Sequence, residues 1–588
     1  MTDFRARTDA FLAEFLALQP TAATLIGEHA YDALWPDMSA AGRREQIAFA
    51  DRWLAEFRGF PDLSDDDAVD RDLLVQQLDA MRFADVDLRE EAWSPLEWVY
   101  LLGGGLFGLV SREFAPLADR LASVAGRLDG IEAVIDAAID EIGPVGKRPV
   151  ARFHTEKALE QLPGVIELAE EALTTAQQAE AEDSAVAAVL PRLRASTERA
   201  RAQMDRFERH LRDEVLPRSE GEGRLGAALF AEKMRHTLRS DDLTPERILE
   251  QAERDYGAVR AEMVRIATDL WPTWFPGTEP PADEKRLVRG VLDAIATDHP
   301  QSEELLDFCR EELERVEAFC RERDLIGLAD EPLDIRWTPT FLRAFGGAML
   351  DSPGPLDRNE KAFFAITPVP EDWPEERKES YLREDNTRML RLLTIHEAVP
   401  GHYLQGVYGN RAPSMLRTIF GLGLFHEGWA VYVTQVMMDV GYGAEDPSLM
   451  LVHWKFYLRS ITNAIIDARI HVHGMTEDEA VSLMVEGGFQ EEAEARNKYD
   501  RARLSSTQLS TYFTGSMEFW DIEREVRRRA AAASGDRRGA DAVPEPRVVG
   551  GYGETPGFTY RPHLENLIAH GAPPTSLLRR LVLQDHGR

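Results

Sequence analysis

The sequence predicts a mainly α-helical protein with a small β-sheet beside a deep cleft. Apolar residues recur every three or four positions over most of the chain, which is the period of an amphipathic helix. Only two runs, LDIRWT at 333–338 and AFFAIT at 362–367, have the composition of β-strands. Both precede a segment with two histidines and a glutamate, so we expect the sheet beside that segment, with one edge available to an extended peptide.

The chain of 588 residues is longer than a single hydrophobic core usually serves, which predicts two domains. The polar, glycine-rich run PRSEGEG at 217–223 separates two helical stretches and is the best candidate linker. We therefore expect an N-terminal helical domain over residues 1–220 and a second, catalytic domain over residues 221–588. Residues 530–557 are rich in alanine, glycine and proline and are expected to form a flexible insertion.

From residue 2 to about residue 218 the pattern is helical and is punctuated by proline and glycine. The run LLGGGLFG at 101–108 lacks the Lys-Ser/Thr pair of a phosphate-binding loop, so its glycines indicate close helix packing or a turn. Residues 151–216 are rich in Ala, Glu and Arg and predict a pair of long, solvated helices.

Thr244 followed by Pro245 is the signature of a helix start. After the histidine segment, helical spacing continues over residues 422–440, 449–471, 476–485, 491–503 and 564–583.

Composition and charge exclude several classes of protein. A hydrophobic fraction of 44% with 26 Phe and 11 Trp predicts a folded core rather than a disordered chain. The 103 acidic and 68 basic residues give a net charge of -35, which repels nucleic-acid phosphates and anionic lipid surfaces. The start of the chain lacks the apolar region of a signal peptide, and no long apolar run follows. We therefore expect a cytoplasmic protein with no nucleic-acid or membrane partner.

The strongest functional signal is the run LTIHEAVPGHY at 393–403. His396, Glu397 and His402 provide what a zinc hydrolase needs, namely two imidazole ligands and a carboxylate that accepts a proton from water on the metal. The usual spacing of such histidines is four residues, which places both on one face of a helix. Here the spacing is six, so the rings can share an ion only if the helix departs from α geometry between them. Pro400 and Gly401 provide the means for such a break.

The two histidines alone are also compatible with a simple helix end, and a third ligand favours the metal site. Catalytic zinc sites usually have three protein ligands and an open position. Glu427, in the run FHEGWA at 425–430, is an acid among apolar and aromatic residues, which is costly unless the acid is paired or bound to a metal. We therefore interpret Glu427 as the third ligand. The neighbouring His426 faces elsewhere on that helix and is a candidate for supporting a ligand or binding substrate.

The runs HEAVPGHYLQ and HEGWAVY resemble a large bacterial family of zincin-like proteins known as a domain of unknown function, whose hallmark is HEAxPGH followed by EGWA. Further similar runs are DARIH, YDR, QLSTYFTG and GAPP, together with LQPTAATLIGEHAYD near the start. That family is similar in turn to helical gluzincins such as carboxypeptidase Taq and oligopeptidases. The resemblance implies a zincin-like (gluzincin) fold, with His396, His402 and Glu427 as ligands and Glu397 as the catalytic base.

The expected reaction is hydrolysis of an amide bond in a short peptide, as in a carboxypeptidase, dipeptidase or oligopeptidase. Zn²⁺, or another divalent transition metal, would lower the pKa of a bound water, and Glu397 would take its proton and pass it to the leaving amine. The oxyanion needs a further donor, for which Tyr512 is the candidate. His471, Arg501 and His563 are candidates for positions behind Tyr512 or for binding substrate. An arginine such as Arg501 also offers a bidentate site for a terminal carboxylate.

Two other functions remain open at the level of sequence. The same metal site suits an amidase, deacylase or esterase that acts on a small amide or other specialised small molecule, with the insertion at 530–557 shaping the mouth of the cleft. Alternatively, a metal-free helical binding protein retains the motif as a relic. The coincidence of Glu397, both histidines and Glu427 argues against this last interpretation, and the sequence leaves the oligomeric state open.

Overall fold

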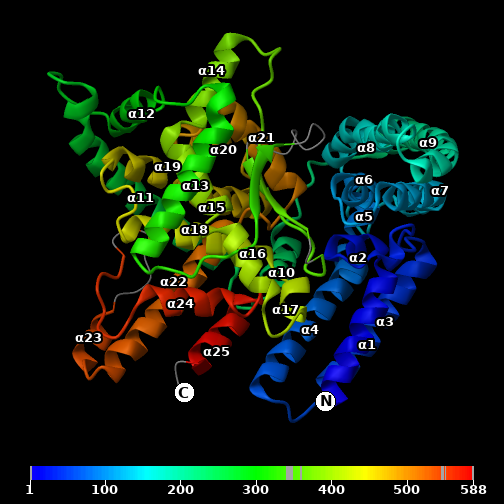
Figure 1. Ribbon diagram of the computed structural model, residues 1–588, viewed down its shortest axis with the longest axis horizontal. Helices are drawn as coiled ribbons and strands as arrows, with labels where there is room; N and C mark the ends of the chain where they lie inside the picture. Colours follow the sequence, from blue (N-terminus) through cyan, green and yellow to red (C-terminus); the bar gives the residue numbers. More distant parts are fainter. Residues whose placement is uncertain (1–2, 339–347, 358–359, 544–548, 550, 586–588) are drawn as a thin grey trace. The chain divides into compact units, whose positions relative to one another are not determined.

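The computed structural model describes residues 3–338, 348–357, 360–543, 549 and 551–585 of the chain (Figure 1). These residues divide into two compact units. The first unit contains Met1–Arg224 together with Pro353–Glu360, and the second contains Leu225–Ser352 together with Lys361–Arg588. Both units are mainly helical, as the sequence predicts.

The first unit is built from helices that pack both against their neighbours in sequence and, as α6 does with α8, against the next helix but one. Its helices are α1 (Asp3–Leu18), α2 (Pro20–Ile26), α3 (Ala40–Arg58), α4 (Asp65–Phe83), α5 (Glu90–Trp93), α6 (Leu96–Ser111), α7 (Leu117–Glu141), α8 (Arg152–Ala179) and α9 (Ser184–His210). α8 and α9 are the long helices expected over 151–216, and α7 also packs on α9. The glycine run at 101–108 lies inside α6, where a side chain on Gly105 would collide with Trp35. Gly105 therefore serves close packing.

The second unit contains the histidine segment. Its helices are α10 (Ala227–Leu238), α11 (Pro245–Trp274), α12 (Glu284–Ile295), α13 (Leu305–Glu322), α14 (Glu375–Glu384), α15 (Thr387–Glu397), α16 (His402–Asn410), α17 (Leu416–Ile419), α18 (Gly423–Asp439), α19 (Pro447–Ala468), α20 (Glu477–Ser482), α21 (Glu492–Leu504), α22 (Thr511–Ala533), α23 (Arg537–Ala542), α24 (Tyr560–Ile568) and α25 (Thr575–Asp585). α11 begins as predicted, because the Thr244 hydroxyl accepts a hydrogen bond from the backbone N of Arg247 at 3.3 Å. The helices expected after the histidine segment appear as α18 to α21, α24 and α25.

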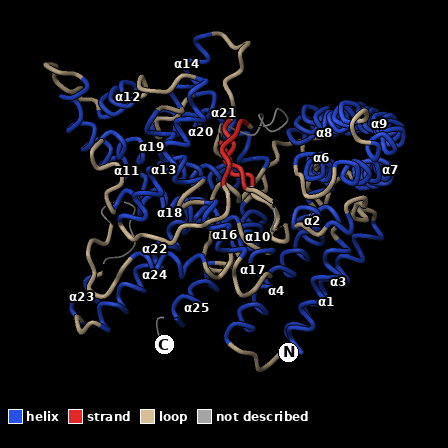
Figure 2. The backbone as a smooth tube through the Cα atoms, in the orientation of Figure 1, coloured by secondary structure: helices blue, strands red, loops and turns tan. Residues whose placement is uncertain are grey.

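The three described strands form one sheet in the order β1-β3-β2, drawn in red in Figure 2. β1 (Leu333–Trp337) and β3 (Ala362–Ile366) are the two strands that the sequence predicts, and they pair in parallel. β2 (Ala348–Asp351), which the sequence does not signal, is antiparallel to β3 and forms an edge. The sheet shares a hydrophobic core with α13 and α15, which includes Phe364 and Leu390. β2 is therefore an edge strand beside α15, the helix that carries the first histidine.

The expected insertion at 530–557 lies partly outside the described residues, which omit 544–548 and 550. Within the described part, α22 continues to Ala533 and is followed by α23. Arg527 Nη1 donates to the carbonyl oxygen of Gly553 at 2.9 Å, and the Tyr552 hydroxyl donates to the carbonyl oxygen of Trp520 at 2.9 Å. These contacts attach the end of the segment to α22.

Candidate metal centre and cleft

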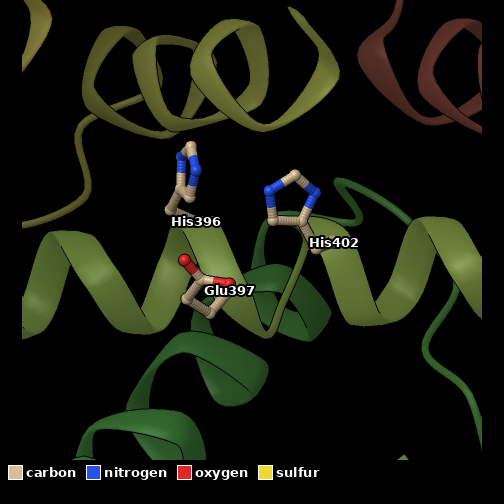
Figure 3. A group of neighbouring side chains, drawn as sticks. All are labelled: His396, Glu397 and His402. Carbon is tan, nitrogen blue, oxygen red and sulfur yellow. The ribbon is translucent and has the colours of Figure 1, made fainter. Parts of the chain in front are cut away.

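The helix that carries the first histidine is interrupted immediately after it. α15 ends at Glu397, and α16 begins at His402. Between them Ala398 (φ -105°, ψ -95°) and Gly401 (φ -72°, ψ -138°) leave helical geometry, and the Val399-Pro400 peptide bond is cis. The break that the spacing of the histidines requires is therefore present. Figure 3 shows both imidazole rings on the same side of the interrupted helix.

Backbone contacts hold the turn between the two helices. Gly401 N donates to the carbonyl oxygen of Ile395 at 3.0 Å, and the indole N–H of Trp429 donates to the carbonyl oxygen of Pro400 at 2.9 Å. A Cβ on Gly401 would collide with the carbonyl oxygens of Ile395 and His396. The close approach of the backbone therefore requires glycine at this position.

Gly401→Ala is expected to push the ends of α15 and α16 apart. The new methyl group meets backbone atoms, which cannot rotate away as a side chain can, so we expect a loss of about 2 kcal/mol in the free energy of unfolding. Zinc affinity should fall as well, because the two rings separate. Urea unfolding measures the first effect, and competition with a zinc chelator measures the second. Gly406→Ala in α16 is the control, since a Cβ there meets nothing within 4 Å, and equal effects of both variants would contradict the assigned role.

Glu427 on α18 faces the two histidines. Its Oε2 atom lies 4.0 Å from Nε2 of His396 and 3.6 Å from Nε2 of His402. The two rings are nearly perpendicular, at 83°, with their centroids 4.8 Å apart. Ligand atoms at about 2.1 Å from a tetrahedral zinc ion lie about 3.4 Å from one another. The donor types therefore suit a divalent metal, and the two distances to Glu427 Oε2 are about 0.2 and 0.6 Å longer than this spacing.

Two glycines bring Glu427 to this position. A Cβ on Gly428 of α18 would collide with Gly515 of α22, and a Cβ on Gly515 would collide with the backbone of α18. The two helices therefore pack closely, which places Tyr512 of α22 near Glu427. Burial opposes ionisation of Glu427, but the hydrogen bond with His402, the charges of both histidines and the Tyr512 hydroxyl together lower its pKa. The candidate ligand is thus an anion.

The two histidines are in different electrostatic environments. Burial and the nearby charge of His402 lower the pKa of His396 to about 3, so its imidazole is neutral, which is the form that binds metals. Burial also disfavours the charged form of His402, but the hydrogen bond to Glu427 and the charges of Glu397 and Glu427 outweigh burial and raise the pKa. The raised pKa makes protonation of His402 compete more strongly with metal binding.

Glu397 lies on the side of the site that faces the sheet and is hydrogen-bonded to β2. Its Oε2 atom accepts a hydrogen bond from the backbone N of Leu350 in β2 at 3.0 Å. Burial, assisted by the charge of Glu427, raises the pKa of Glu397 to about 7 although the charge of His402 opposes this shift. One ligand atom from each of His396, Glu397 and His402 lies within 4.8 Å of the others. A carboxyl group that titrates near neutrality at this position suits a proton acceptor that later returns the proton.

Gln405, which the sequence analysis did not single out, supports His402. It lies three residues further along α16, its side chain is buried, and its hydrogen bond contributes to the raised pKa of His402. The Nε2 atom of Gln405 is 2.8 Å from Nδ1 of His426. Burial lowers the pKa of His426 to about 4, so this ring is neutral and accepts the hydrogen bond. His426 thus contacts Gln405, and it is not among the described residues that line the cleft.

The site opens into a cavity of about 770 Å³. Ala348 of β2 lines it, so the sheet flanks the cleft as predicted. The sequence did not identify most of the polar lining, because polar residues at helical spacing are typical of a solvent-exposed face. These additional lining residues include Glu384 and Asp385, Arg459 and Asn463 of α19, and Glu494, Asn497 and Lys498 of α21.

Two predicted site residues lie elsewhere. His471 stacks on Phe230, with ring centroids 4.9 Å apart, and its two ring nitrogens contact backbone groups. The Nε2 atom of His563 is 3.2 Å from the hydroxyl of Tyr432. Neither histidine is among the described residues that line the cavity, so the structure does not place either of them where it would contact a substrate in the cleft. The reason is that helical spacing fixes a residue's position on its own helix but not which neighbouring helix it meets.

Tyr512 and Arg501 do lie at the site, and both line the cavity. Arg501 Nη2 is 3.3 Å from the Tyr512 hydroxyl and 3.1 Å from Oε1 of Gln508. Arg501 is therefore the candidate that contacts the Tyr512 hydroxyl.

Comparison with known proteins identifies similar chains without assigning an activity. The model of a family described as "Bacterial protein of unknown function (DUF885)" matches residues 20–542. The chain is similar to "a putative lipoprotein of unknown function from Shewanella oneidensis", with 29% identity and a TM-score of 0.81 over 99% of this chain and 100% of that one. It shares the fold of "the putative lipoprotein from Colwellia psychrerythraea", with 15% identity and a TM-score of 0.74 over 97% of each chain. No curated protein matches the chain significantly.

The cytoplasmic location expected from the sequence is contradicted, because the two similar structures are each described as a "putative lipoprotein". Among the described helices, none is both long and apolar enough to cross a membrane. A covalently attached lipid holds a protein at a membrane without any spanning helix. The absence of a long apolar run from the sequence therefore does not establish where the protein is located.

Proposed function

Since the chain belongs to the bacterial family of unknown function DUF885, we propose its function from the site itself, as a zinc-dependent hydrolase that cleaves amide bonds of short peptides. Another divalent transition metal suits the same donors. The observation that carries the proposal is the interruption between α15 and α16. It brings two imidazoles to the carboxylate of Glu427 and leaves Glu397 beside them. This donor set is that of a gluzincin, which supports a zincin-like relationship.

Each residue of the site has a distinct role in the proposed reaction. His396, His402 and Glu427 would hold the metal, which when bound polarises a carbonyl group and lowers the pKa of a coordinated water. Glu397 takes a proton from the attacking water and returns it to the nitrogen of the leaving amine, so that a C–O bond forms while the C–N bond breaks. The Tyr512 hydroxyl donates a hydrogen bond to the carbonyl oxygen as that oxygen gains negative charge.

The form of the cleft favours a short peptide as the substrate. Its volume of about 770 Å³ lies in the range of small-ligand sites and excludes a folded protein. β2 is an edge strand, and its residue Ala348 lines the cavity, so an extended peptide backbone can pair with it. Met389, Leu393 and Phe456 provide apolar surface for side chains.

Metal content and substrate class test the proposal. We expect about one zinc ion per chain, hydrolysis of short N-acetylated peptides, loss of hydrolysis with a chelator and its return with added zinc. Libraries of acyl amides and esters are assayed in parallel. Hydrolysis confined to those libraries would favour an amidase, deacylase or esterase, and a protein without stoichiometric metal after purification with zinc would favour a metal-free binding protein.

A further inference from the structure

One face of α21 borders the cleft. Glu494, Asn497, Lys498 and Arg501 recur at the spacing of one helical face, and all four line the cavity. On its other walls, this part of the cavity is bordered by Arg459 of α19 and by Glu384 at the end of α14. The cleft therefore combines several cations and carboxylates in a protein whose net charge is -35.

Most of these charges neutralise one another. Glu494 Oε1 lies 3.1 Å from Arg459 Nη2 and 3.3 Å from Lys498 Nζ. Glu384 lies 2.8 Å from Lys455 Nζ and 3.6 Å from Arg459 Nη1. Each of these two carboxylates is therefore shared between two cations, and neither is available to a positively charged ligand.

Arg501 differs from the other cations of the cleft. Among the described residues its hydrogen-bond partners are the neutral side chains Gln508 and Tyr512, and no carboxylate forms an ion pair with it. Arg501 is an exposed residue, and the charge of Arg501 adds to that of Lys498 nearby. A planar guanidinium without a carboxylate partner is suited to bidentate binding of a carboxylate from outside the chain.

The position of Arg501 also sets the distance between such a carboxylate and the reacting bond. The Tyr512 hydroxyl lies 3.3 Å from Arg501 Nη2, and it is close enough to Glu427 to lower the pKa of that carboxyl. A hydrogen bond spans about 3 Å, and one residue of extended chain spans about 3.5 Å. A carboxylate bound by Arg501 and a carbonyl group bound by the Tyr512 hydroxyl are therefore separated by about one residue of extended chain rather than by several.

We propose that Arg501 binds the C-terminal carboxylate of the peptide, so that the enzyme removes single residues from the C-terminus. This inference rests on the proposed hydrolase function and specifies its substrate as a peptide with a free carboxylate. The carboxylate of the last residue forms two hydrogen bonds with the guanidinium group. The preceding amide carbonyl then lies at the histidines and Tyr512.

Arg501→Gln tests this assignment with pairs of N-acetylated peptides that differ only in a C-terminal carboxylate or carboxamide. The wild-type protein should cleave the acid and not the amide, and mass spectrometry should show loss of one residue. In Arg501→Gln, kcat/KM for the acid should fall about 10- to 100-fold, mainly through KM, because a charged hydrogen bond is lost. Arg501→Lys should restore part of this loss.

Arg496→Gln is the matched control on the same helix. Arg496 pairs with Glu477 and Glu492 on the exposed side of α21, so this variant should retain wild-type kinetics. Equal cleavage of acid and amide by the wild-type protein, or an equal loss on both in Arg501→Gln, would overturn the role of Arg501 and leave the hydrolase function standing. Cleavage of neither substrate class, with zinc bound, would overturn the hydrolase function and this inference together.

Discussion

Glu397→Gln is expected to abolish turnover while the metal stays bound. Glutamine preserves the size of the side chain, and its carbonyl oxygen still accepts the hydrogen bond from Leu350 N, which is 3.0 Å long in the wild-type protein. The amide cannot accept a proton from water, and loss of a general base lowers turnover by about 10²- to 10⁴-fold. We expect the upper end of this range, because Glu397 both removes the proton and returns it. The measurements are kcat on a cleaved peptide and zinc content by elemental analysis.

Glu492→Gln is the control for this variant, since Glu492 lies at the exposed start of α21 and pairs with Arg496. It should retain both zinc and turnover. If Glu397→Gln keeps turnover within about tenfold of the wild-type rate, a different group is the base, because that loss lies below the range for general-base catalysis. If it loses zinc together with activity, Glu397 is a ligand, an arrangement that its proximity to both histidines also permits.

Much of the fold is predictable because its elements carry local signals. The strands β1 and β3 have β-branched and aromatic residues in short runs, and the structure confirms both to within one residue of the predicted ends. β2 has no such signal, since its four residues, AMLD, are no more typical of a strand than of a helix. Its pairing with β3 is a tertiary effect. The strand nearest to Glu397 is therefore the one that local pattern misses.

The centre of the site is predictable for a different reason. Two histidines six residues apart cannot share an ion on a regular helix, so the sequence requires an interruption, and Pro400 and Gly401 show where it occurs. The surroundings carry no such constraint. Gln405 is a polar residue at helical spacing without a sequence signal, and Arg501 is one candidate among several. Only the packing of α16 and α21 shows that Gln405 lies next to His426 and that Arg501 borders the cleft.

Glu427→Gln should have the opposite outcome from Glu397→Gln, with loss of the metal itself. Glu427 Oε2 lies 3.6 and 4.0 Å from the two imidazole Nε2 atoms, whereas Glu397 is held by the backbone of β2. Hydrogen bonds and the charges of the histidines lower the pKa of Glu427 against the effect of burial, and a ligand to a divalent cation needs this anionic form. A neutral amide supplies a much weaker donor.

Removal of a residue that hydrogen-bonds to a metal ligand lowers metal affinity by about 10- to 100-fold. Because Glu427 would be a ligand itself, the loss of zinc affinity in Glu427→Gln should be larger than this. His396→Ala should lose the metal as well, because it removes a neutral imidazole from the same set. Chelator competition and elemental analysis measure both variants beside Glu397→Gln. Stoichiometric zinc in His396→Ala would refute the ligand set. If Glu427→Gln retained zinc and Glu397→Gln lost it, Glu397 would be the ligand and Glu427 the base. The pair of glutamine variants therefore decides which carboxylate binds the metal and which one moves the proton.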